Sequence, residues 1–273
     1  MRVQILCDSC CDFTATERLS SVFQKVPATV VVSGCRLADD KQFQQRALLE
    51  ALRAASLELK LEFPDERAYL EAMDPGAEEI YLVTSSAAVS DQYETASRAR
   101  RMFLRERPDC RIHVFNTRSG SVGQLLAARQ ICRLQRSGCA FRQIVERVET
   151  EILSSTLLLL PASPEGLRQG GLIHRRRGWG RLHGIYRMTL EGTVARAAAA
   201  LTERSAEKRL AELLGNSETA GKTCLISHCG AVERARRLAQ LLQKNGRFSS
   251  ILLTEAGAVS SLLLQEGGVA VGF

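Results

Sequence analysis

Short apolar runs alternate with amphipathic stretches along the first half of the chain. Residues 3–6, 80–84 and 111–115 are rich in β-branched, leucine or aromatic side chains, which is typical of short buried strands. One further strand is expected over residues 26–32. Strands that alternate with helices indicate a largely parallel sheet. The helices expected in this half begin near Ala15 and cover residues 46–57, 66–73, 91–106, 124–135 and 141–153.

The pattern changes after about residue 155. Residues 186–194 predict a β-hairpin, because Glu191-Gly192 is suited to a tight turn between apolar positions. The mixed order of elements predicts a second α/β domain with a mixed sheet, so we expect domains at 1–155 and 156–273 with a ligand between them. The remaining strands are expected over 157–160, 224–227, 250–253 and 269–273, and the remaining helices over 165–169, 203–214, 231–245 and near Ser260.

Small polar residues follow three of the expected parallel strands. In an open parallel sheet, ligands bind beyond the carboxyl ends of the strands. Hydroxyl groups and free N–H groups at a helix start suit an anionic head group. The alternative is that these residues only cap the helices that follow them. The residues are Asp8 and Ser9 after the first strand, Ser85, Ser86 and Ser90 after the second, and Asn116, Thr117, Ser119, Gly120 and Ser121 after the third.

Composition places the chain among globular proteins. Of its 273 residues, 45% are apolar and 25% are charged, the ordinary balance for such proteins. No apolar stretch approaches the roughly 18 residues of a membrane span, so the chain is not expected to cross a membrane. Asp8 and Asp12 interrupt the apolar start before it resembles a signal peptide. We therefore expect a cytoplasmic protein whose nine cysteines are reduced thiols, several of them buried.

The net charge of +7 raises the question of nucleic-acid binding. The densest basic segment covers residues 173–183, and the other arginines fall on helices with apolar faces, where charges are usually solvated. No helix-turn-helix, zinc-finger or RNA-recognition pattern accompanies them. We predict no nucleic-acid partner. The basic segment is either a docking patch for an acidic partner or simply solvated.

Metal, cofactor and catalytic patterns are weak. Cys7, Cys10 and Cys11 lie close together, but no second ligand pair follows at zinc-site spacing, so no metal and no cofactor is expected. No G-x-S-x-G elbow surrounds any serine. A small-molecule enzyme would need a general base among Asp8, Asp91 and His228 in one cleft, and this alternative stays open.

Six segments stand in the order and spacing of a known family. They are residues 3–12 (V-Q-I-L-C-D-S-C-C-D), 26–39 (V-P-A-T-V, then Gly34 and Asp39), 86–96 (S-A-A-V-S-D-Q-Y-E-T-A), 114–119 (V-F-N-T-R-S), 167–173 (L-R-Q-G-G-L-I) and the last strand. In this series the chain resembles the DegV family of bacterial fatty-acid-binding proteins nearly from end to end. The corresponding family patterns are T-D-S-x-x-D, V-P-L-x-V…D-G…D, S-S-G-L-S-G-T-Y-x-x-A, V-x-D-S-x-S, L-x-K-G-G-R-I and G-A-L-G-V-G-F.

The resemblance implies a lipid-binding role. Members bind one fatty acid with its tail in an apolar tunnel and its carboxylate held by hydroxyl groups between the domains. They present that carboxylate to a separate fatty acid kinase and do no chemistry alone. Burial of each methylene is worth about 0.8 kcal/mol, so the tail supplies most of the binding. The residues expected to contact the ligand are Asp8, Ser9, Leu61, Ser86, Ser90, Thr117, Gly170 and Gly171.

The chain departs from the family pattern at polar positions. Leu61 stands where the family has a threonine, Leu172 where it has an arginine, and Leu263 where it has a histidine. Loss of a hydrogen bond to a charged group costs about 1.5–3 kcal/mol, which weakens a head group without cancelling the tail. Glu62 and Asp91, also substitutions, would repel a nearby carboxylate. The alternative function is therefore a DegV relative that regulates, interacts with another protein, or binds a different ligand without kinase coupling.

Overall fold

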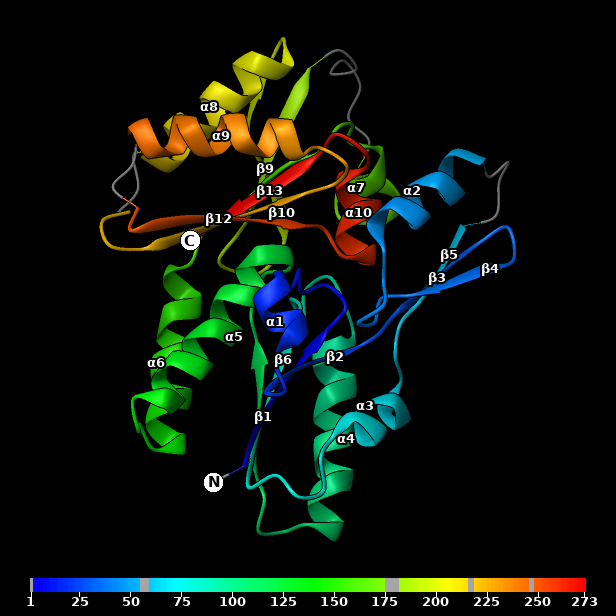
Figure 1. The fold of residues 1–273 in the computed structure, drawn as a ribbon, viewed down its shortest axis with the longest axis vertical. Helices are drawn as coiled ribbons and strands as arrows, with labels where there is room; N and C mark the ends of the chain where they lie inside the picture. The colour runs from blue at the N-terminus through cyan, green and yellow to red at the C-terminus, as the bar shows by residue number, and fades with distance from the viewer. Residues whose placement is uncertain (1, 55–58, 175–181, 216–218, 246–247) are drawn as a thin grey trace.

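The structure, a computed structural model, describes residues 2–54, 59–174, 182–215, 219–245 and 248–273 (Figure 1). Two sheets, one above the other, form its framework, and a smaller sheet lies to one side. The fold class predicted from the sequence is confirmed: a parallel sheet forms from the first part of the chain and a mixed sheet from the last part.

The first sheet is fully parallel, with strand order β2-β1-β6-β7. Its strands are β1 (Val3–Asp8), β2 (Phe23–Val26), β6 (Glu79–Thr84) and β7 (Arg111–Asn116). β6 is buried along its whole length, as a strand covered by helices on both faces must be. The helices around this sheet are α1 (Ala15–Leu19), α3 (Glu66–Ala72), α4 (Gln92–Glu106), α5 (Ser121–Arg136) and α6 (Phe141–Ser154).

A separate antiparallel sheet of three strands, in the order β4-β3-β5, packs against α2. Its elements are β3 (Thr29–Val32), β4 (Cys35–Ala38), β5 (Leu59–Glu62) and α2 (Gln45–Ala54). The single strand expected over residues 26–32 is wrong. The chain leaves the parallel sheet at Val26 because Pro27 has no N–H to donate, and the Ala28 N–H donates to Ser9 Oγ at 2.6 Å instead of to a strand. The expected end of the α2 helix at residue 57 lies outside the described residues.

The last part of the chain forms a six-stranded mixed sheet in the order β10-β9-β8-β13-β11-β12. Among the described strands of this sheet, only β11 and β12 pair in parallel. The predicted hairpin is present between β9 and β10, and Gly192 in its turn has φ +81°, which favours glycine. The strands are β8 (Leu157–Leu160), β9 (His183–Met188), β10 (Val194–Ala200), β11 (Thr223–His228), β12 (Ser250–Glu255) and β13 (Val269–Gly272). The helices are α7 (Glu165–Gln169), α8 (Glu203–Gly215), α9 (Val232–Asn245) and α10 (Ala258–Leu264).

Helix α5 lies between the two large sheets, and α8 and α9 cover the far side of the six-stranded sheet (Figure 1). Leu125 and Ile131 of α5 belong to one core with Ile5 and Tyr81 of the parallel sheet and Leu225 of the six-stranded sheet. This shared core joins the sheets through one helix. The division into domains at 1–155 and 156–273 stays a prediction.

Two findings concern the chemical character of the chain. None of the helices in the described part of the chain is long and apolar enough to cross a membrane. All nine cysteines are free thiols, as expected from the sequence, and six of them are buried.

Candidate functional site

An apolar cavity of about 150 Å³ lies where the carboxyl end of the parallel sheet meets the six-stranded sheet. Its apolar wall comes from elements far apart in the sequence, so the cavity exists only in the folded chain. Leu157 and Leu159 of β8 form its floor on the six-stranded sheet. The other apolar side chains around it are Leu61, Phe63, Val89, Leu172, Met188, Val194, Val259, Leu263 and Leu264.

The polar part of the cavity lining consists mainly of serines from the loops after β6 and β7 and from α10. The Ser85 hydroxyl donates to Asp8 Oδ2 at 2.9 Å, and the Ser121 hydroxyl donates to Asp12 Oδ2 at 2.5 Å. Ser119 Oγ is buried and has no hydrogen-bond partner within the described residues. The full polar lining is Cys10, Ser85, Ser90, Ser119, Ser121 and Ser260.

Asp8 holds the polar side in place. Its Oδ2 also accepts from the Ser85 N–H at 2.7 Å, and its Oδ1 accepts from the Cys10 N–H at 2.9 Å and from Gln124 Nε2 at 3.0 Å. Burial raises the pKa of Asp8, and the hydrogen bonds from Ser85, Gln124 and Cys10 oppose that rise. The carboxylate therefore fixes the loops after β1 and β6 against α5.

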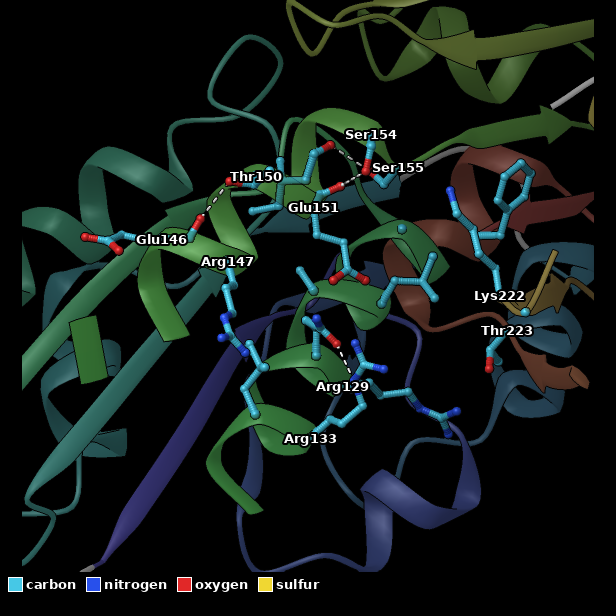
Figure 2. Close-up of a pocket in the computed structure, with 18 residues that line it drawn as sticks. Arg129, Arg133, Glu146, Arg147, Thr150, Glu151, Ser154, Ser155, Lys222 and Thr223 are labelled. Carbon is cyan, nitrogen blue, oxygen red and sulfur yellow. Dashed lines mark hydrogen bonds between the residues drawn. The ribbon is translucent and has the colours of Figure 1, made fainter. Parts of the chain in front are cut away.

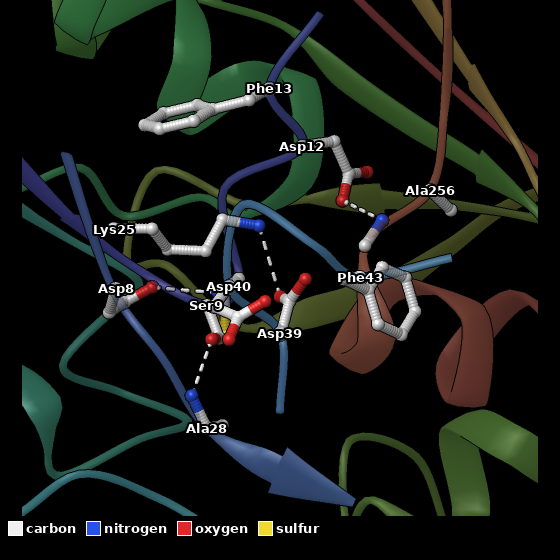
Figure 3. A network of polar contacts seen from close by, with 12 residues as sticks. Asp8, Ser9, Asp12, Phe13, Lys25, Ala28, Asp39, Asp40, Phe43 and Ala256 are labelled. Carbon is white, nitrogen blue, oxygen red and sulfur yellow. Dashed lines mark hydrogen bonds and ion pairs between the residues drawn. The ribbon is translucent and has the colours of Figure 1, made fainter. Parts of the chain in front are cut away.

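Asp12 forms a second buried node, which joins the parallel sheet to the six-stranded sheet (Figure 3). Its Oδ2 accepts from Ser227 Oγ at 2.7 Å as well as from Ser121, and its Oδ1 accepts from the Gly257 N–H at 2.8 Å. Ser121 has φ +50°, in the left-handed region, and its N–H donates to the Cys10 carbonyl at 2.6 Å. These contacts hold a strained serine backbone at the cavity wall.

A buried ion pair lies beside this node. Lys25 Nζ is 3.0 Å from Asp39 Oδ2, and both side chains are almost fully buried. Burial raises the pKa of Asp39, and the charge of Lys25 opposes the rise. Asp39 Oδ1 has no hydrogen-bond partner within the described residues. The region behind the serines thus holds the carboxylates of Asp8, Asp12 and Asp39 with the ammonium group of Lys25.

The structure places three of the residues expected from the sequence in the cavity wall: Leu61, Ser90 and Gly170. Ser90 Oγ accepts from the Gln92 N–H at 3.3 Å, at the start of α4. Asp8 lies directly behind the wall, where it binds Ser85. Whether these residues contact a ligand stays a prediction.

The other expected residues have structural partners and do not line this cavity. Ser9 Oγ accepts from the Ala28 N–H, and the Ser86 hydroxyl donates to the Gly192 carbonyl at 2.7 Å. The Thr117 hydroxyl donates to the Thr84 carbonyl at 2.8 Å, and Thr117 borders a different cleft, of about 640 Å³. Gly171 has φ +70° just beyond the end of α7. A ligand contact by Ser9, Ser86, Thr117 or Gly171 also stays a prediction.

Three leucines that replace family polar residues line the same cavity, although they come from β5, the segment after α7, and α10. These are Leu61, Leu172 and Leu263. A Cβ on Gly170 would lie 2.7 Å from Leu263 Cδ2, so this glycine makes room for the leucine. The two acidic substitutions do not line the cavity. Glu62 pairs with Arg36 and Lys60, whose hydrogen bonds lower its pKa to about 2, and Asp91 is exposed at the start of α4.

The site residues that sequence reasoning did not single out are Ser119 and the apolar wall from β8 to β10. Ser119 was visible only as one of several serines after a strand. Ser119 differs from the other serines because its buried hydroxyl has no hydrogen-bond partner among the described residues, and only the folded structure reveals this. Met188 and Val194 belong to the hairpin, whose position over the cavity no local pattern reveals.

A larger cleft of about 840 Å³ lies between α5, α6 and the start of β11, and several charged side chains line it (Figure 2). Arg133 and Lys222 line it on either side of Glu151. Burial raises the pKa of Glu151, and the charges of the two cations oppose only part of that rise. Arg129 lines it too, but pairs with Glu17 at 2.8 Å. No residue expected from the sequence to bind a ligand lines this cleft, and its charges do not suit an acyl chain.

The residues considered as a general base do not share a cleft. Asp8 is enclosed by hydrogen-bond donors, Asp91 is exposed, and His228 lies at the end of β11. His228 Nδ1 is buried without a partner among the described residues, and burial lowers the pKa of the ring. None of the three lines the apolar cavity. Among the described residues, no group of His, Cys, Asp or Glu is arranged to hold a metal ion.

Comparison with known proteins decides the family. A family model described as "Uncharacterised protein, DegV family" matches residues 2–273, almost the whole chain. The chain belongs to the DegV family. A curated DegV domain-containing protein from Streptococcus pneumoniae strain R6 is 27% identical over 180 residues, and this match spans 65% of the present chain and 64% of the relative's length.

Solved DegV structures share the fold over its full extent. A DegV family protein from Ruminococcus gnavus, solved with vaccenic acid, is 26% identical and superposes with a TM-score of 0.94 over 99% of both chains. The fatty acid kinase B3 protein of Streptococcus pneumoniae, loaded with linoleic acid, is 22% identical with a TM-score of 0.91 over 100% of this chain and 99% of that one. At that identity, the second likeness shows the DegV fold.

Proposed function

We propose that this DegV protein binds one long-chain fatty acid or similar lipid, with its tail in the apolar cavity and its head group at the serine side. The observation that carries the proposal is the lining of the cavity, which combines leucine, valine, methionine and phenylalanine side chains with a few serine hydroxyls. Such a lining suits an amphipathic ligand, because apolar contacts supply the affinity and a few polar groups fix the orientation. The bound vaccenic acid of the Ruminococcus gnavus protein supports the same role.

The size of the cavity bears on how such a ligand binds. An engineered apolar cavity of about 150 Å³ holds a benzene molecule, and the cavity here has about the same volume, 150 Å³. A long acyl chain therefore needs side chains in the wall to rotate outward. Phe63 is 40% exposed and Met188 is partly exposed, so both have room to move. We propose that these side chains move outward when the lipid binds. We also propose that binding takes place in the cytoplasm and that the protein carries out no catalysis of its own.

Native mass spectrometry tests the proposal. Protein purified from a bacterial host without delipidation is expected to carry the added mass of one acyl chain. Val89→Trp would fill the cavity with an indole ring and is expected to abolish that added mass. Val232→Trp is the matched control, since Val232 is exposed on α9 and away from the cavity. Wild-type protein with no bound lipid and no uptake of added lipid would overturn the proposal.

We further propose that the protein presents the bound lipid to a fatty acid kinase. The second candidate function is lipid binding without presentation to a kinase. One observation favours this second function: Leu172 and Leu263 line the cavity where a phosphoryl transfer would benefit from cationic or hydrogen-bonding groups. Incubation of the loaded protein with a bacterial fatty acid kinase and ATP separates the two. Formation of an acyl phosphate supports presentation, and its absence alongside proven lipid binding supports binding alone.

A further inference from the structure

Charged side chains are absent from the described residues that line the apolar cavity, and its polar side chains are those of five serines and one cysteine. An ionised carboxylate in such a place needs donors or a cation, because removing a charge from water without a partner is costly. Which hydroxyl protons are free to face the cavity therefore decides which head group fits.

Two of the serines have already used their protons. The single hydroxyl hydrogen of Ser85 is donated to Asp8, and that of Ser121 is donated to Asp12. The Asp8 carboxylate also accepts hydrogen bonds from three N–H groups. A carboxylate has no proton to donate, so in its bond with Ser85 the serine must be the donor. Ser85 and Ser121 consequently present lone pairs, and not protons, to the cavity.

The remaining hydroxyl groups in the lining are those of Ser90, Ser119 and Ser260. Ser119 Oγ is buried and has no partner among the described residues, so it is free to donate or accept. Ser90 Oγ accepts from the Gln92 N–H, which leaves its own proton available. The wall thus offers both donors and acceptors. A carboxylate accepts hydrogen bonds only, whereas a primary amide or an alcohol both donates and accepts.

The charged groups behind the cavity wall also disfavour an ionised head group. Asp8, Asp12 and Asp39 lie behind the serines with Lys25, whose ammonium group pairs with Asp39. Cys10 lies in the cavity wall beside these carboxylates. Burial and then the negative charge of Asp8, with smaller effects of Asp12 and Asp39, raise the pKa of its thiol well above the usual range, although a hydrogen bond with Ser85 opposes the rise. A second negative group placed beside Cys10 meets the same opposition.

We propose that this cavity prefers a long-chain lipid with an uncharged polar terminus, such as a primary amide or an alcohol, over the ionised fatty acid of the same length. This inference rests on the proposed lipid binding and names the ligand class for that site. Leu61, Leu172 and Leu263 complete the selection, because they surround the chain with apolar side chains and supply no cation to a carboxylate.

Competitive displacement of Nile red from delipidated full-length protein tests the preference. Hexadecanamide and hexadecanoate are compared at a pH of about 8, where a carboxylic acid with a pKa near 4.3 is ionised. The amide is expected to bind at least about ten-fold more tightly, equivalent to about 1.4 kcal/mol. Equal or tighter binding of hexadecanoate overturns the preference and leaves lipid binding intact. Failure of both ligands to bind overturns the proposed function and the preference with it.

A variant with a positive charge in the cavity provides a second test of the preference. Leu172→Arg is expected to raise the affinity for hexadecanoate about ten-fold and to leave that for hexadecanamide little changed. Leu201→Arg is the matched control, since Leu201 is 78% exposed and does not line the cavity. An arginine at 172 that leaves the order of the two ligands unchanged counts against the charge argument. The wild-type comparison stands alone if this variant does not fold.

Discussion

Ser227 donates a hydrogen bond of 2.7 Å to Asp12 across 215 positions of the chain. Asp12 follows the first strand of the parallel sheet, and Ser227 lies within β11 of the six-stranded sheet. The same carboxylate binds Ser121, at the start of α5, and the Gly257 N–H, before α10. One buried side chain therefore links the two sheets that enclose the cavity.

Replacement of Asp12 is expected to destabilise the whole fold. Asp12→Ala leaves Ser121, Ser227 and the Gly257 N–H without their acceptor, and hydrogen bonds to a charged group are worth roughly 1.5–3 kcal/mol each. We expect a loss on the order of 3 kcal/mol in the free energy of unfolding, measured by urea denaturation. Asp109→Ala, at an exposed position, serves as the control and should change stability little. A near-neutral Asp12→Ala would contradict the role given to this node.

Ser119 and Ser86 are expected to respond in opposite ways to loss of their hydroxyls. Ser119→Ala removes a buried hydroxyl that has no partner among the described residues, so stability should stay the same or rise slightly. The affinity for a lipid whose terminus reaches Ser119 should fall several-fold. Calorimetric titration with delipidated protein measures that affinity.

Ser86→Ala is the matched comparison, because its hydroxyl binds the Gly192 carbonyl and secures the hairpin. This variant should lose about 1 kcal/mol of stability and keep more of its ligand affinity than Ser119→Ala. The reverse ranking, with affinity lost at Ser86 and retained at Ser119, would return Ser86 to the ligand site that its sequence motif predicts.

His228 is expected to make the fold sensitive to mild acid. Burial lowers the pKa of His228 from its usual 6.5, and the charge of Arg236 adds to this, while Glu255 and Asp12 oppose it. A group with a lowered pKa in the folded state contributes stability above its unfolded pKa, and that contribution is lost as the pH falls through the folded pKa. Urea midpoints measured from about pH 7.5 to about pH 5 should fall less for His228→Gln than for the wild type. Parallel pH profiles would show that other groups dominate.

Cys10 and Cys35 are expected to react at different rates with a thiol-labelling reagent. Thiolate is the reactive form, and the pKa of the Cys10 thiol is raised well above its usual value by burial and the neighbouring carboxylates. Cys35 is exposed. Brief treatment with iodoacetamide followed by peptide mapping should find Cys35 modified and Cys10 intact. Rapid modification of Cys10 in the native protein would show that the wall is less buried or less negative than the structure indicates.

Much of the fold follows from local patterns, and the exceptions have physical causes. The run 80–84 identifies a strand because covering helices select apolar residues along its whole length. β4 and β5 escaped prediction because they are half-exposed edge strands whose polar residues, such as Lys60 and Glu62, obscure any alternation. A single strand was predicted through Pro27 because β-branched residues stand on both sides of it. In the structure β2 ends at Val26 and a strand of another sheet, β3, begins at Thr29.

The site was harder to predict than the fold because its properties depend on distant partners. Leu61, Leu172 and Leu263 stand out in the sequence only as departures from the family pattern, and the fold brings all three to one cavity. Ser86 looked like a ligand contact by its motif, yet its hydroxyl proton goes to a carbonyl 106 positions away. Ser119 differs from its neighbours only in having no partner within the described residues. Hydrogen-bond pairing over such separations leaves no trace in local spacing.

We propose that the cavity beyond the carboxyl end of the parallel sheet holds a single acyl chain. A crystal structure of the protein purified without delipidation would show such a chain. We expect continuous density for one chain in contact with Leu61, Leu159 and Leu263, with its polar terminus beside Ser119. Density for an acyl chain in the larger cleft beside Glu151, or an empty cavity in protein shown to carry lipid, would contradict this binding site.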